Sequence, residues 1–108
     1  MSDELTAISR RRKEAYGEFL ARESAVYRAF LEMERAAFAD GALPRKAKDL
    51  IAVGISVVIN CESCMQWHIE QAAAAGAAEN EMGGGPPTAH ARFALRVMAT
   101  VFGPRDQD

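Results

Sequence analysis

The chain has 108 residues, the size of one ordinary domain and far below the roughly 250 residues of a TIM barrel. Apolar residues make up 49% and charged residues 26%, which excludes a wholly disordered protein. Thirteen basic and fifteen acidic residues give a formal net charge of −2. The basic run 10–13 is followed at once by Glu14 and Glu18, so it predicts a solvated helix face and no nucleic-acid partner. We expect a single domain over 1–108.

Targeting signals give a second set of expectations. No run reaches the ~20 consecutive apolar residues of a membrane span, and the acidic N-terminus has no apolar signal core behind it. These features predict a cytoplasmic protein with no membrane contact. The two cysteines of a cytosolic chain are more often catalytic or metal-binding than a structural disulfide.

The first half of the chain is predicted to be helical. Alanine, the best helix former, occurs 21 times, and there are only four prolines. A first helix is predicted over about 3–21, with sparse apolar positions that indicate an N-terminal helical arm (1–22). Ser24 is a candidate N-cap for a second helix, which Asp40-Gly41 should end. Pro44 is placed to open a third helix.

The apolar run Leu50–Ile59 is ambiguous by propensity. Six of its residues are β-branched aliphatics, which favours a buried strand. However, the chain has no second run of this kind to pair with it, and a lone strand would leave its backbone groups unsatisfied. We therefore predict a helix surrounded by apolar partners. A domain of this size has too few helices to cover it, so we expect a homo-oligomer.

The second half follows the same pattern. Asn60 is a candidate N-cap for a helix over Cys61 to about Ala75, which Gly76 should close. The run 83–87 (Gly-Gly-Gly-Pro-Pro) predicts a hard break, and 88–102 predicts a last helix. The tail 103–108 should fray. The predicted fold is all-α, with about five helices and no sheet.

One segment has the character of a site, namely Cys61-Glu62-Ser63-Cys64-Met65-Gln66-Trp67-His68. On a helix, spacings of three and then four residues bring Cys61, Cys64 and His68 to one face. A first-turn cysteine is stabilised as a thiolate by unpaired backbone N–H groups and the helix dipole. His68, one turn beyond Cys64, can accept its proton.

Several kinds of site share this pattern. Two core cysteines and a histidine could meet by chance, or three ligands plus His90 could bind zinc. Covalent haem would need histidine directly after Cys64, and an iron–sulfur cluster usually needs four thiolates. A dithiol–disulfide redox site fits the spacing best, and it predicts that the protein holds no stoichiometric zinc.

The motif and the run before it closely resemble the carboxymuconolactone decarboxylase-like family, and more narrowly its alkylhydroperoxidase D branch. The stretches 36–46, 71–77 and 82–86 are also similar to that family, so the resemblance covers about 24–102. The branch places an acidic residue twelve positions before the first cysteine, which is Asp49 here. The family usually has glutamate there, so Asp49 is expected to orient His68 either directly or through a water. The segment between Gly76 and Gly83 is shorter than in the family.

The resemblance implies a thiol-dependent peroxidase or disulfide reductase with Cys64, Cys61, His68 and Asp49 as its catalytic residues. First-turn position favours Cys61 as the attacking thiolate, whereas proximity to His68 favours Cys64. The resemblance points to Cys64, with Cys61 as the resolving thiol. It also implies a trimer or hexamer, a peroxide or disulfide substrate, an external dithiol reductant and no cofactor. The alternatives are a γ-carboxymuconolactone decarboxylase-type enzyme, which the paired cysteines disfavour, and a non-catalytic redox-sensing module.

Overall fold

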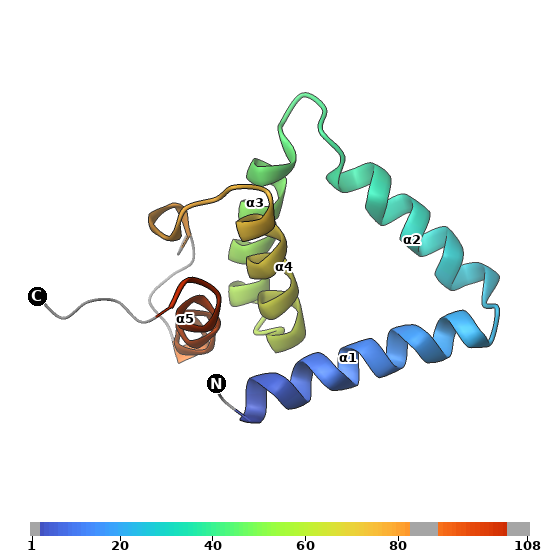
Figure 1. Ribbon diagram of the computed structural model, residues 1–108. Helices are drawn as coiled ribbons and strands as arrows, with labels where there is room; N and C mark the ends of the chain where they lie inside the picture. The colour runs from blue at the N-terminus through green and yellow to red at the C-terminus, as the bar shows by residue number, and fades with distance from the viewer. Residues whose placement is uncertain (1–2, 83–88, 104–108) are drawn as a thin grey trace, which may run out of the picture.

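The computed structural model describes residues 3–82 and 89–103, and this part of the chain contains helices joined by short loops and no strand (Figure 1). The elements are α1 (Asp3–Ala21), α2 (Ala25–Phe38), α3 (Arg45–Val58), α4 (Glu62–Ala74), the 3₁₀ turn η1 (Glu79–Glu81) and α5 (Ala89–Phe102). The prediction of an all-α fold of about five helices is therefore confirmed for the described residues. Within them, no helix is both long enough and apolar enough to cross a membrane.

The centre of the molecule is the pair α3 and α4, which lie side by side, with α5 packed against them (Figure 1). Met65 and Ile69 of α4 are fully buried, because α3, α5 and the start of α1 surround this face of the helix. The core is made of Leu5, Ile8, Val53, Val57, Met65, Ile69, Phe93, Ala94, Val97 and Met98. This core holds α4, and hence the cysteine–histidine motif, in place.

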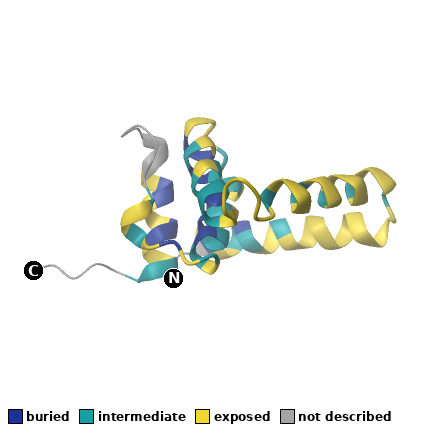
Figure 2. Cartoon of the chain, turned by 90° about the horizontal axis from the view of Figure 1, so that it is seen from above, coloured by how far each residue is buried: buried dark blue, intermediate teal, exposed yellow. Residues whose placement is uncertain are grey.

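Helices α1 and α2 form an arm that projects from this core. The first turns of α1 are anchored, since Leu5 and Ile8 are buried in the core. Beyond them, most of α1 and most of α2 are exposed (Figure 2). The radius of gyration of 14.7 Å accordingly exceeds the roughly 13 Å expected for a compact domain of this length.

The tip of the arm is held by aromatic side chains and one helix cap. Tyr27 stacks on Phe19, with ring centroids 4.7 Å apart, and meets the edge of Tyr16 at 6.0 Å. Ser24 is the N-cap of α2, and its side chain accepts a hydrogen bond from the backbone N–H of Tyr27. The predicted cap is therefore confirmed. Helix α2 ends at Phe38, before the Asp40-Gly41 pair that was expected to end it.

The apolar run is helical over 50–58, as predicted, and forms most of α3, with Ile59 as the C-cap. Its burial is one-sided in the single chain. Val53, Ser56 and Val57 face the core. A stripe at helical spacing on the other side is between 54% and 61% exposed, and it consists of Ile51, Ile55, Val58 and Ile59. This agrees with the expectation that a single chain has too few helices to cover the run, since no helix in the described part of the chain covers this stripe.

Of the two residues predicted to bound the helix that carries the motif, Gly76 is confirmed and Asn60 is not. Gly76 takes a positive φ of 96° just after α4, where it lets the N–H of Ala77 bond the carbonyl of Ala72. Asn60 is not the N-cap of α4; it has a φ of 55°, and Cys61 is the cap. The predicted break at 83–87, the start of the last helix at 88 and the tail 104–108 lie outside the described residues.

The buried core leads to a prediction about the free energy of unfolding. We expect Ile69→Ala to lower the free energy of unfolding by about 2–5 kcal/mol, because it leaves a cavity at a fully buried position. Chemical denaturation at one fixed protein concentration measures the loss. Val26→Ala is the control, since Val26 is 81% exposed on the arm, and it should change stability by less than about 0.5 kcal/mol. Equal losses in the two variants would contradict the described core.

Candidate functional site

The first part of the site is the start of α4. Cys61 has extended backbone angles at the N-cap, and its sulfur accepts a hydrogen bond from the N–H of Cys64 at 3.3 Å. The two cysteines form a disulfide. The left-handed turn at Asn60 sends the chain from the end of α3 into this cap. Cys61 therefore lies one position before the first helical turn, and its sulfur still faces the backbone N–H groups that favour a thiolate.

The second part is the pair of His68 and Asp49, which α4 and α3 bring together. The His68 Nδ1 and Asp49 Oδ1 atoms are 3.6 Å apart, a contact longer than a hydrogen bond. The side chains are only 15% and 2% exposed, respectively. Nδ1 of His68 is buried with no hydrogen-bond partner. With Nδ1 turned to Asp49, Nε2 is the nitrogen left to serve a thiol or substrate.

The buried carboxylate of Asp49 has a second partner that the sequence analysis did not identify. Nε of Arg45, one turn earlier on α3, lies 3.4 Å from Oδ2 of Asp49. The same guanidinium donates to the side chain of Gln71 on α4 at 2.9 Å. Arg45 thus ties the two helices together beside His68. Its i,i+4 spacing from Asp49 is a signal readable in the sequence, whereas the contact with Gln71 required the fold.

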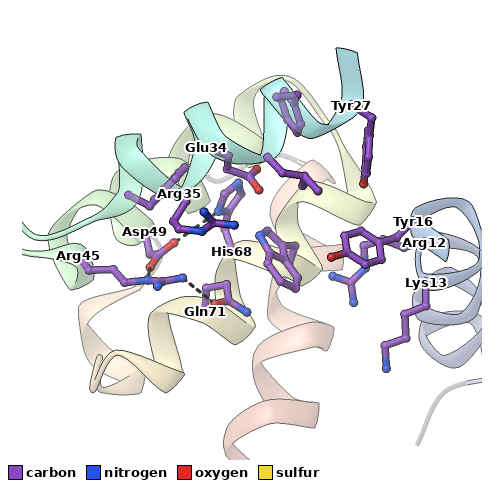
Figure 3. Close-up of a pocket in the computed structure, with 14 residues that line it drawn as sticks. Arg12, Lys13, Tyr16, Tyr27, Glu34, Arg35, Arg45, Asp49, His68 and Gln71 are labelled. Atoms are coloured by element: carbon purple, nitrogen blue, oxygen red, sulfur yellow. Dashed lines mark hydrogen bonds and ion pairs between the residues drawn. The ribbon is translucent and has the colours of Figure 1, made fainter. Parts of the chain in front are cut away.

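A cavity of about 590 Å³ lies beside His68 and Asp49, between the arm and α3–α4 (Figure 3). Phe38 of α2 stacks on the His68 ring with centroids 5.3 Å apart. Tyr27 also lines the cavity, and burial, then Tyr16 and Glu34, raise its pKa above the usual 10.0. Its phenol therefore stays protonated at neutral pH and can donate a hydrogen bond.

Two further residues of this cavity pack against each other. Trp67 is 37% exposed and lines the cavity. Arg12 does not belong to a solvated face: its side chain is 21% exposed and its guanidinium lies 5.0 Å from the centre of the Trp67 ring. Arg10 of the same run is exposed, as predicted. The burial of Arg12 could not be read from the sequence, because it depends on how α1 crosses α4.

The arrangement also bears on metal binding. Within 3–82 and 89–103, no group of three or more His, Cys, Asp or Glu side chains is placed to hold a metal ion. The side chain of His90, the candidate fourth zinc ligand, lies outside the described part. The structure thus brings together two pairs among the four predicted site residues: Cys61 with Cys64, and His68 with Asp49. Cys64 and His68 share one face of α4 at i,i+4 spacing.

These features define an all-helical protein that carries a Cys-x-x-Cys disulfide at a helix start and a histidine–carboxylate pair one turn further on. Residues 24–96 match the Carboxymuconolactone decarboxylase family, and the chain belongs to that family. The resemblance found in the sequence is therefore confirmed at the family level.

Related proteins cover nearly the same length. The chain is 34% identical over 99 residues to "uncharacterized protein 4 in cox locus" of Paracoccus denitrificans, covering 82% of this chain and 89% of the relative. It is 36% identical over 101 residues to an uncharacterized protein of Cupriavidus necator, covering 84% and 86%. The crystal structure of a carboxymuconolactone decarboxylase family protein from Legionella pneumophila in its apo form has the same fold. It superposes with a TM-score of 0.77 at 24% identity, over 95% of this chain and all of that one.

Proposed function

We propose that the protein is a thiol-dependent oxidoreductase of the peroxidase or disulfide-reductase type, which cycles Cys61 and Cys64 between dithiol and disulfide. The observation that carries the proposal is the Cys61–Cys64 disulfide at the start of α4, on the helix that also holds His68. A paired carboxylate at Asp49 supports His68 as a base. Membership of the family is compatible with this chemistry.

The proposed reaction balances as follows. His68 takes the proton of Cys64, and the thiolate attacks the terminal oxygen of a hydroperoxide ROOH. The O–O bond breaks, Cys64 becomes a sulfenic acid, and the leaving alkoxide takes the proton from His68 to give ROH. The Cys61 thiol then attacks the Cys64 sulfur, which forms the disulfide and releases water. An external dithiol reduces that disulfide by exchange and is itself oxidised.

A thiol titration coupled to a turnover assay tests the function. After reduction, the protein should show two free thiols per chain, lose both on adding cumene hydroperoxide, and regain them with a dithiol. The same dithiol should sustain hydroperoxide consumption. Reversible loss of two thiols without turnover would refute the enzyme and indicate a redox-sensing module. No thiol change at all would refute the redox proposal and leave a decarboxylase or a scaffold.

The exposed stripe on α3 leads us to propose that the chain works as a homo-oligomer, a trimer or a hexamer. Four large aliphatic side chains at i, i+4, i+7 and i+8 form one continuous apolar face in the single chain. Light scattering at micromolar concentration should give a mass of three or six chains, and Ile55→Glu should lower it. Ala74→Glu, an exposed position at the end of α4, is the matched control. A stable monomer for the unmodified chain would contradict the proposal.

A further inference from the structure

The cavity beside His68 has a charge opposite to that of the chain. Four cationic and two acidic side chains line it, an excess of two positive charges, whereas the whole chain carries −2. The cations are Arg12, Lys13, Arg35 and Arg45, and the acids are Glu34 and Asp49. Such a cavity attracts an anion.

Three of these cations already have an acidic partner. Arg45 is held by Asp49 and Gln71, and Arg35 pairs with Glu32 at 2.8 Å. Arg12 pairs with Glu70 through its Nη2 at 3.4 Å, while its Nε and Nη1 are buried with no hydrogen-bond partner. Buried N–H donors of this kind are costly unless an acceptor meets them, and a charged carboxylate oxygen is a strong acceptor for a guanidinium N–H.

The remaining walls are apolar and aromatic. They include the rings of Tyr16, Tyr27, Phe30, Phe38 and Trp67. The volume of about 590 Å³ is in the range of small-molecule sites. In Figure 3, Arg12 and Lys13 lie at one end of the cavity and Arg45 with Gln71 at the other, with His68 between them. A molecule anchored at Arg12 would therefore extend its apolar body toward His68.

Arg12 also lines a second cavity. This cavity, of about 780 Å³, is lined by Asn60, Glu62 and Ser63, the residues that flank Cys61. It shares Arg12, Tyr16 and Tyr27 with the first cavity. An anion on Arg12 thus lies at the wall common to both, between His68 and the start of α4.

We infer that this cavity binds small organic carboxylates with an apolar, preferably aromatic, body, and that Arg12 is the specificity-determining residue. Resting on the proposed function, the preferred substrate is a hydroperoxide that carries such a carboxylate. Lys13, which has no ion-pair partner among the described residues, adds a second positive charge at the same end.

Binding to the disulfide form tests the inference without turnover. The probes are 4-isopropylbenzoate and its neutral isostere 4-isopropylbenzamide, followed by calorimetry and by the fluorescence of Trp67, the single tryptophan of the chain. The carboxylate should bind at least about ten-fold more tightly than the amide, as expected for a charge-assisted hydrogen bond. Arg12→Gln should remove most of that preference. Arg10→Gln, an exposed arginine that lines neither cavity, should keep it.

Three results would overturn the inference. They are equal affinity for the two probes, binding of neither probe, and an equal loss of the preference for the carboxylate in Arg12→Gln and Arg10→Gln. Binding of neither is also the result expected if a second copy of the chain fills the cavity. If Arg12→Gln does not fold, Lys13→Gln provides the test, with a smaller loss of the same preference.

A kinetic comparison separates this inference from the proposed function. With the reduced protein, 4-(2-hydroperoxypropan-2-yl)benzoate should have a kcat/KM about ten-fold above that of cumene hydroperoxide, which lacks the carboxylate. If neither peroxide is turned over but the protein still prefers the benzoate to the benzamide, the proposed function is refuted. The assignment of an anion site then stands. Turnover of both with equal kcat/KM would support the function and overturn the substrate assignment.

Discussion

The Cys64→Ser variant should lose hydroperoxide turnover by at least ~10³-fold, because the proposed attacking sulfur is gone. Cys61→Ser should behave differently. Its Cys64 thiolate can react once, but without a resolving thiol it should stay trapped as a sulfenic acid or a mixed disulfide. Mass spectrometry of each variant after one equivalent of peroxide locates the adduct. Cys64→Ser should carry none.

This experiment decides between two opposing features of the site. The N-cap position of Cys61, whose sulfur accepts the N–H of Cys64, favours a thiolate at Cys61. The i,i+4 neighbour His68 favours proton removal from Cys64. An adduct on Cys61 in Cys64→Ser, with none on Cys64 in Cys61→Ser, would reverse the assignment. Ser63→Ala is the matched control, since Ser63 contacts the Cys61 sulfur at 3.7 Å and should retain turnover.

His68→Ala should lower kcat/KM by roughly 10²–10⁴-fold, the usual contribution of a general base. Asp49→Asn should cost less, about ten-fold, because Asp49 is expected to act only through His68. We propose that the carboxylate acts by positioning His68, since the two side chains are in contact and both are largely buried. Stopped-flow oxidation of the reduced protein by cumene hydroperoxide measures both effects.

Asp49→Glu is the matched control for this pair. Compared with Asp49→Asn, this variant has the negative charge again. Its side chain is one methylene longer than aspartate and is the glutamate usual in the family. It should therefore recover most of the rate lost in Asp49→Asn. Circular dichroism and denaturation should show that each variant is folded, because Asp49 is buried between two helices. Full activity in His68→Ala would show that His68 is not the base. Unchanged activity in Asp49→Asn would remove Asp49 from the site.

A large part of the site follows from local spacing. The Cys-x-x-Cys motif and His68 lie on one short segment, so helix geometry alone places them on one face. Asp49 is on a different helix and was reached through resemblance to a family. The contact between His68 and Asp49 across α4 and α3 agrees with that assignment. The helical state of the run 50–59 could also be predicted from the sequence. The chain has no second strand-like run to pair with it, so only a helix satisfies its backbone N–H and C=O groups.

By itself, then, the sequence determined the helices, the caps at Ser24 and Gly76, and the Cys-x-x-Cys motif with its following histidine, because each depends on residues within a few positions of one another. The tertiary structure decided which faces are covered. Only the crossing of α1 over α4 buries Arg12 against Trp67, and only the approach of α2 places Phe38 on His68. These contacts join residues far apart in the chain, and they depend on how helices pack, which periodicity within one helix does not specify.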